Sequence, residues 1–236
     1  MRNETTFYNE ATASLDMGLR KYMQSVFSYM SAGLGLTAIV AYLFSSSETA
    51  MRMMFSSPGI ALIFALIPFG IVIYLSTQIA KISPDRAKFL FFAYAACLGL
   101  SLAPIFAVYT GASIANAFFV SASMFLSMVI YGYATEKDLT NFGAFLFMGL
   151  IGLIVASLVN LFLRSSAMDF IVSVVGVVVF TGLTAFDAQR IKNYYMESEA
   201  TELREKKAIF GALNLYMDFI NLFLYVLRFL GATRNR

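Results

Sequence analysis

The chain has 236 residues, of which 59% are hydrophobic and only 13% are charged. Soluble domains carry about 25% charged residues, so the composition excludes an ordinary soluble domain, and the formal net charge of +3 is too small to indicate a nucleic-acid-binding protein. Histidine is absent and Cys97 is the one cysteine, which excludes imidazole metal ligands, histidine pH sensors and disulfides within one chain.

Apolar runs near 20 residues long, the length that crosses a bilayer core, predict an all-α membrane protein with seven transmembrane helices. The first run starts too late and is too long to be a cleaved signal peptide, so residues 1–21 are expected to form a cytoplasmic N-terminal tail. A single transmembrane domain then covers 22–231, and 232–236 form a C-terminal tail. The predicted spans are 22–44, 59–80, 89–109, 114–134, 142–163, 168–187 and 208–230.

The links between these spans are short and polar. Residues 45–58 are predicted to form a loop, 81–88 a compact basic turn, and 110–113 a tight hairpin. Residues 189–207 read as the one long polar connection and are the most charged stretch of the chain. No soluble domain or repeat array is expected.

The lysines and arginines of the links predict the orientation. With the N-terminus in the cytoplasm, twelve of them fall on the cytoplasmic side, and only Arg52 and Arg164 lie in the opposite links. This bias favours a cytoplasmic N-terminus. Arg228, Arg234 and Arg236 do not fit seven full crossings. Either they are a tolerated exception, or the last helix is short or re-entrant.

The last predicted span carries one polar stripe on an apolar surface. Its members recur at helical steps of three and four residues: Gly211, Asn214, Asp218, Asn221, Tyr225 and Arg228. An ionisable residue inside a spanning helix almost always faces the bundle or a water-filled cavity. The stripe therefore predicts that the last helix is central and is surrounded by other helices.

Two carboxylates, Asp187 and Asp218, are candidates for a functional site. Each alone would be an unpaired membrane carboxylate, so the two are expected to meet, provided that the last helix starts displaced or the sixth is tilted. Two carboxyl groups in contact share one proton, and their oxygens suit a transient Ca²⁺ ion. Asn214 and Asn221 would add oxygen ligands, although hydrogen bonding between helices is the favoured interpretation for each.

Plain structural roles are the alternative for both aspartates. Asp187 would then be a solvated residue at a helix end, and Asp218 would be a partner for a polar side chain within the bundle.

The residues around both aspartates resemble the Bax inhibitor-1 family, also called the transmembrane Bax-inhibitor-motif family. The matching motifs are Phe186-Asp187-Ala188-Gln189, Leu215-Tyr216-Met217-Asp218-Phe219-Ile220-Asn221-Leu222-Phe223 and Arg228-Phe229-Leu230-Gly231. The likeness covers essentially the whole chain. The short tail and compact loops are similar to the bacterial branch, which implies an inner-membrane protein.

The resemblance implies six helices around a central seventh, and a pH-sensitive calcium leak controlled by aspartates that match Asp187 and Asp218. No cofactor is implied; calcium and protons are the expected ions. The resemblance also implies an arginine that latches the first aspartate at the end of the second span. That position falls on Lys81, which lacks the bidentate fork of arginine; Arg86 is the other candidate.

Acid is expected to open such a channel, with a transition at about pH 6–7, because protonating Asp187 breaks its pair with the latch. Replacing Lys81 by alanine should loosen the latch, and replacing it by arginine should tighten it.

Two other functions compete with the channel. Some bacterial relatives modulate the membrane protease FtsH and eukaryotic ones restrain cell death, so the chain would act by protein binding without transport. An intramembrane aspartyl protease would use the two aspartates as acid and base, but neither lies in the Gly-x-Gly-Asp context of such enzymes, and a serine protease would lack its histidine. The sequence therefore predicts a protein that is not an enzyme.

Overall fold

The structure is a computed structural model that describes residues 2–79 and 81–233; for residues 2–16, Phe55, Pro58 and Ala61 it describes the backbone alone. Within that part the chain is helical, and its elements are α1 (Arg2–Ser46), α2 (Glu48–Phe55), α3 (Pro58–Gln78), α4 (Pro84–Leu102), α5 (Ile105–Val108), α6 (Gly111–Ala134), α7 (Thr140–Leu163), α8 (Ser166–Asn193) and α9 (Thr201–Leu230).

Six of the described helical stretches are long and apolar enough to cross a membrane. They lie at Met17–Ser46, Pro84–Val108, Gly111–Ala134, Thr140–Leu163, Ser166–Asn193 and Thr201–Leu230. The apolar part of α3, Leu62–Gln78, is shorter. The expectation of a multi-pass, all-α membrane protein is thus confirmed, with six long apolar helices and one shorter one.

Several predicted loops are helical. The predicted tail continues the first span, since α1 is helical from Arg2 onward. Within the predicted loop 45–58, α2 begins behind the Ser47 cap, and Arg52 lies 2.6 Å from Glu48 one turn earlier. Polar residues with good helix propensity extend a helix beyond its apolar part, which a hydropathy pattern does not detect.

The predicted long connection is the largest difference. Because α8 continues to Asn193 and α9 begins at Thr201, the link shrinks from 189–207 to 194–200. The third predicted span is divided, because α4 ends at Leu102 and the short helix α5 follows Pro104, whose ring nitrogen has no hydrogen to donate.

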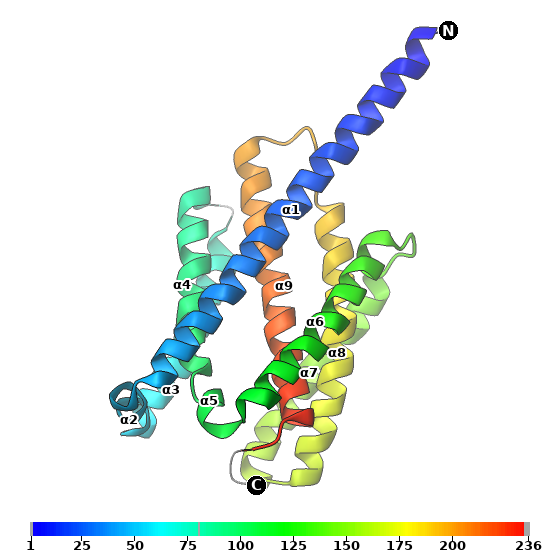
Figure 1. Ribbon diagram of the computed structural model, residues 1–236. Helices are drawn as coiled ribbons and strands as arrows, with labels where there is room; N and C mark the ends of the chain where they lie inside the picture. The colour runs from blue at the N-terminus through cyan, green and yellow to red at the C-terminus, as the bar shows by residue number, and fades with distance from the viewer. Residues whose placement is uncertain (1, 80, 234–236) are drawn as a thin grey trace.

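The bundle has two chemically different ends. At one end lie the α3–α4, α6–α7 and α8–α9 links (Figure 1), and we call it the basic end. Its described basic residues are Arg20, Lys21, Lys81, Arg86, Lys88, Lys137, Arg190, Lys192, Arg204, Lys206 and Lys207. The opposite, C-terminal end carries Arg52, Arg164 and Arg228.

The last helix runs the length of the bundle. After α9, the Ala232 carbonyl accepts a 3.3 Å hydrogen bond from the Thr110 N–H, and the Ala232 N–H donates to Ser113 Oγ at 3.0 Å. The described part of the chain thus ends beside the α5–α6 link, at the end opposite the α8–α9 link (Figure 1). A short or re-entrant last helix is therefore wrong. Arg234 and Arg236 lie outside the described residues.

The most buried of the six long apolar helices is α9. It lies between α4 on one side and α6 and α8 on the other, and α1 crosses it (Figure 1). Direct packing on α9 is mainly by these four helices, whereas α3 packs on α4 and α7 packs on α8. The last helix is central, as predicted. However, four helices pack on it directly, and α3 and α7 form an outer layer against α4 and α8.

A polar contact joins α9 to its neighbours within the core. Tyr216 is fully buried, and its hydroxyl shares a 2.6 Å hydrogen bond with Thr37 on α1. Thr37 Oγ1 also lies 2.8 Å from the Ala95 carbonyl of α4. Because a buried hydroxyl without a partner is destabilising, this contact favours one register for α1, α4 and α9.

Candidate functional site

The two predicted aspartates meet inside the bundle. Asp218 on α9 is 5% exposed, and the side chain of Asp187 on α8 is 14% exposed. Their carboxyl groups lie close enough to interact, on the wall of one cavity. Two carboxyl groups buried side by side cannot both ionise cheaply, so one proton is expected to be shared between them.

The helix lengths explain how the pair forms. Asp187 lies six residues before the end of α8, whereas Asp218 lies 17 residues after the start of α9. The two residues reach the same height because α9 extends past the end of α8 at the basic end (Figure 1). The start of α9 is thus displaced relative to the end of α8, as the pairing of the two aspartates requires.

The pair borders a cavity of about 780 Å³. Its walls come from α7, α8 and α9, with Phe69 of α3 on the remaining side. Most of the wall is apolar, and the polar side chains concentrate around the carboxyl groups: Thr140, Asp187, Arg190, Asn214, Asp218 and Asn221. One carboxyl oxygen of Asp218, Oδ2, is buried and has no hydrogen-bond partner among the described residues.

The nearest basic group to the pair is Arg190. Its Nη1 lies 3.7 Å from Asp187 Oδ1, one turn along α8. The same guanidinium donates from Nε to the Tyr194 hydroxyl at 2.7 Å and covers the Tyr194 ring. Arg190 is therefore held between the aspartate pair and the α8–α9 link.

The two predicted latch residues lie elsewhere in this conformation. Lys81 is exposed in the α3–α4 link, and Arg86 is exposed on the first turn of α4. Neither forms an ion pair with Asp187 among the described side chains. Since α3 packs on α2 and α4 rather than on α8, the basic partner of Asp187 here is on its own helix.

The predicted polar stripe of α9 does face the cavity. Asn214, Asn221 and Tyr225 line it together with Asp218. The Asn221 amide donates to the Met217 carbonyl at 2.8 Å, so its side-chain oxygen remains available as a ligand. Tyr225 stacks on Phe180 with ring centroids 5.7 Å apart.

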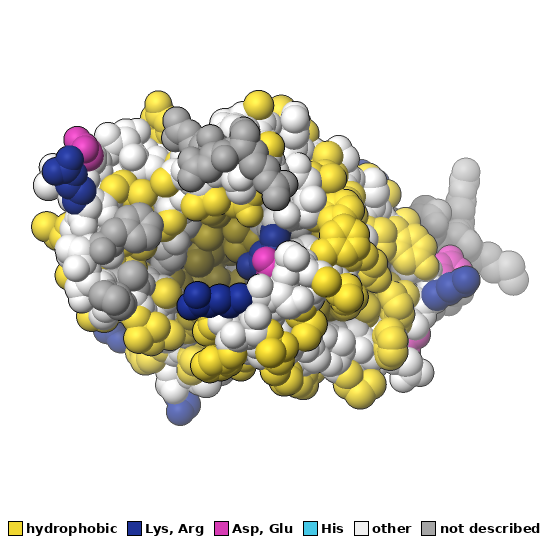
Figure 2. Space-filling view, turned by 90° about the horizontal axis from the view of Figure 1, so that it is seen from below, with side chains coloured by type: hydrophobic (Ala, Val, Ile, Leu, Met, Phe, Trp, Pro, Cys, Tyr) yellow, Lys and Arg dark blue, Asp and Glu magenta, His cyan; other side chains and the backbone are white. Residues whose placement is uncertain are grey.

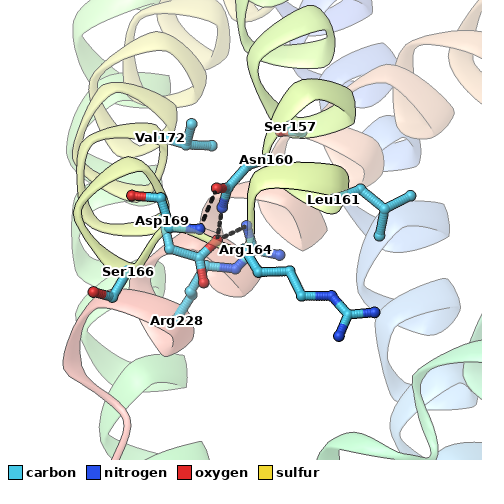
Figure 3. Close-up of a pocket in the computed structure, with 9 residues that line it drawn as sticks. Ser157, Asn160, Leu161, Arg164, Ser166, Asp169, Val172 and Arg228 are labelled. Atoms are coloured by element: carbon cyan, nitrogen blue, oxygen red, sulfur yellow. Dashed lines mark hydrogen bonds and ion pairs between the residues drawn. The ribbon is translucent and has the colours of Figure 1, made fainter.

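A second pocket lies farther along the stripe, at the C-terminal end. Figure 2 shows this end face-on, hollowed and lined by hydrophobic side chains, with basic and acidic groups at the rim. The pocket measures about 490 Å³ and is lined by residues of α7, α8 and α9, among them Asn160, Asp169 and Arg228 (Figure 3). The Asn160 amide donates to Asp169 Oδ1 at 2.9 Å, and Arg228 Nη1 lies 3.9 Å from the same oxygen.

The motif residue Gln189 has a structural role that the sequence did not reveal. Its side-chain oxygen accepts from the Leu139 N–H at 2.9 Å, and its amide donates to the Lys137 carbonyl at 2.7 Å. Gln189 thereby ties the α6–α7 link to α8, two residues after Asp187. This structural role explains why the motif has a glutamine two residues after Asp187.

Arg190, Asp169 and Asn160 were not predicted as site residues. Arg190 was counted only toward orientation, although its place three residues after Asp187 puts it on the same helical face. Asp169 and Asn160 lie on different helices, nine residues apart around the α7–α8 turn, and no periodic signal joins them.

The aspartate pair supplies few ligands for a metal ion. Among the described residues, no set of three or more carboxylate or thiol side chains is grouped to hold a metal ion. Two carboxyl groups with nearby amide oxygens supply few ligands for calcium, which takes six to eight oxygens. Water would therefore have to complete its shell in the cavity.

Together, the bundle and the aspartate pair define a multi-pass helical membrane protein with ionisable groups in its interior. The family model described as "Inhibitor of apoptosis-promoting Bax1" matches residues 19–235. The chain therefore belongs to the Bax inhibitor-1 family, as its motifs predict.

Bacterial relatives match over nearly the full length. The chain is 46% identical over 222 residues to the uncharacterised protein RP147 of Rickettsia prowazekii, covering 94% of both chains. It is 47% identical over 216 residues to an uncharacterised protein of Borreliella burgdorferi, covering 91% of this chain and 93% of the relative. It is 45% identical over 219 residues to the inner membrane protein YbhL of Escherichia coli, covering 92% and 94%.

Proposed function

We propose that the protein is a pH-gated calcium leak channel whose pathway passes the Asp187–Asp218 pair. The observation that carries the proposal is a pair of buried, neighbouring carboxyl groups on the wall of a cavity of about 780 Å³, between helices that are long and apolar enough to span a membrane. Carboxyl oxygens attract a hard divalent cation, and their shared proton makes the site sensitive to pH.

The proposed membrane arrangement follows from the charges. The short helix α3 would be the seventh crossing, and the basic end, with the N-terminus, would face the cytoplasm. The similarity to an inner membrane protein of Escherichia coli supports the same location for this chain. Ions would leave the cavity through the second pocket, where Asp169 offsets the charge of Arg228.

The proposed gate is the ion pair of Asp187. In this conformation the partner is Arg190 at 3.7 Å. For Lys81 or Arg86 to pair with Asp187 in another state, the region of α3 and the start of α4 would have to move toward α8. Protonation of Asp187 removes either pair and frees the helices to separate.

An enzymatic role is not proposed. A carboxyl pair sharing a proton is also what an aspartyl protease requires, so the distinction rests on experiment. A protein that acts only by binding a membrane protease would neither conduct ions nor cleave peptides.

Replacing Asp218 by alanine is expected to abolish calcium flux, because it removes the most buried carboxylate of the pathway. The measurement is calcium uptake by liposomes that contain only the purified protein. Asp85→Ala is the matched control, since the Asp85 side chain is 95% exposed and lies outside the cavity. Equal flux in the Asp218 variant and the parent, or peptide cleavage by the parent, would refute the proposal.

A further inference from the structure

A pocket that takes no part in the proposed ion pathway lies at the basic end. It measures about 440 Å³ and opens between the start of the apolar part of α1 and the first turns of α9. Lys21, Tyr22 and Ser25 line it from α1, and Thr201 and Arg204 line it from α9. Tyr195 of the α8–α9 link completes the wall.

The pocket has an excess of positive charge. Its one lining carboxylate, Glu205, is engaged elsewhere: Lys88 lies 2.5 Å from it and the Tyr29 hydroxyl donates to it at 3.3 Å. Lys21 and Arg204 have no carboxylate within ion-pair distance among the described side chains. Two cations therefore face this pocket without a counter-charge from the described side chains.

The first turn of α9 adds N–H donors beside the pocket, and it also carries the acidic residue Glu202. The N-cap residue is Ala200, which has no side chain able to cap the helix. Uncapped N–H groups and the helix dipole make a helix N-terminus a ready anion site. Thr201 and Arg204, which line the pocket, belong to this turn.

A buried hydroxyl gives a second, independent indication of a ligand. Tyr22 is only 6% exposed, and its hydroxyl has no hydrogen-bond partner among the described residues. The Tyr195 hydroxyl is likewise buried and unpartnered. The two rings are in contact, with centroids 5.5 Å apart. Buried polar atoms are nearly always satisfied in a native protein, so a bound acceptor is expected here.

The nearby carboxylate does not reverse the charge of the pocket. Glu199 in the α8–α9 link is paired with Lys207 at 2.5 Å. Its remaining oxygen, Oε2, is buried and cannot donate to an anion unless protonated. The donors left for a ligand are the two cations, the two tyrosine hydroxyls and the helix end.

We propose that this pocket binds the phosphate group of an anionic phospholipid. A phosphate accepts several hydrogen bonds at once. Its negative charge would also neutralise Lys21 and Arg204. The pocket lies where α1 and α9 begin their membrane-spanning parts, at Met17 and Thr201, which is the depth of the headgroups. Tyrosine and basic residues are typical of that level. Such a site is independent of ion conduction.

The test uses the purified full chain, freed of phospholipid in detergent, and measures its unfolding temperature as lipid is added. Phosphatidylglycerol is expected to raise this temperature more than phosphatidylcholine does. The double variant Lys21→Gln/Arg204→Gln should bind phosphatidylglycerol about tenfold more weakly or worse, given about 1 kcal/mol for each basic residue near an anionic lipid surface. Lys81→Gln/Lys137→Gln, which removes the same charge at the same end outside the pocket, should respond like the parent.

Tyr22→Phe provides a variant that keeps the fold if the double variant does not. Without lipid it should be at least as stable as the parent, because an unpaired buried hydroxyl is gone, and its response to phosphatidylglycerol should be weaker. The proposal would be overturned if the two lipids raised the unfolding temperature of the parent equally. It would also be overturned if phosphatidylglycerol raised that of the pocket variants as much as that of the parent. A soluble phosphate or glycerol phosphate that reproduces the full shift would overturn the assignment to a lipid.

Discussion

Replacing Asp187 by asparagine is expected to leave calcium flux high and nearly constant between about pH 5 and pH 8. Asparagine has the shape of a protonated aspartate and cannot form the ion pair with Arg190 that lies at 3.7 Å in the parent. In the parent, the closed state holds Asp187 ionised and therefore binds fewer protons than the open state. Acid favours the state that binds more protons, so the parent should open as the pH falls.

Three variants separate the possible partners of Asp187. If Arg190 holds the closed state, Arg190→Gln should raise flux at about pH 8 by about tenfold, the effect of losing about 1.4 kcal/mol of closed-state stabilisation. Lys81→Gln and Arg86→Gln should raise the flux at this pH only if a latch from the α3–α4 region forms in another state. A full pH response in Asp187→Asn would mean that the pH sensor is elsewhere.

Replacing Gly132 by valine is expected to prevent α6 and α8 from packing together. A Cβ atom at Gly132 would lie 2.1 Å from the Ala185 carbonyl oxygen, and the next nearest atoms are also Ala185 backbone. Backbone cannot move aside as a flexible side chain can, so α8 would have to shift. Overpacking of this kind costs about 1–3 kcal/mol or more. The shift would also displace Asp187, which lies two residues after Ala185.

Thermal unfolding of the purified variant measures this effect. Gly152→Ala on α7 is the matched control, because no heavy atom lies within 4 Å of the added Cβ. That control should be neutral or slightly stabilising, since alanine is favoured over glycine in a helix by roughly 0.5–1 kcal/mol. An unchanged unfolding temperature in Gly132→Val would show that α6 and α8 do not approach as closely as described.

The apolar runs were sufficient to predict the membrane class and the middle of each long helix. The period of polar residues on α9 also predicted the face that carries Asp218, because an ionisable group cannot be left toward lipid. Both signals are local in sequence, and both survive in the structure because burial and lipid exposure act on each helix separately.

The helix ends were not predictable in the same way. Tyr195 packs against Gly18 at a position where a Cβ would nearly coincide with its hydroxyl, and this contact helps to hold the short α8–α9 link against α1. Gln189 holds the α6–α7 link by two hydrogen bonds. Such tertiary contacts decide where a polar segment continues as helix, and composition alone does not reveal them.

The basic partner of Asp187 illustrates a second limit. A resemblance transfers a role to a position, here Lys81, but the distance between α3 and α8 depends on the conformation. Arg190 could have been considered from helical spacing alone. The second pocket of Asn160, Asp169 and Arg228 joins three helices, and its members come together only in the folded bundle.

The most direct test of the central claim is an electrical recording from a planar bilayer that contains only the purified protein, with calcium as the one permeant cation. The proposed channel predicts a calcium current that grows as the pH is lowered from about 8 to about 6 and that is absent with Asp218→Ala. A silent bilayer at every pH, or a current of equal size with Asp218→Ala, would contradict a calcium pathway through the aspartate pair.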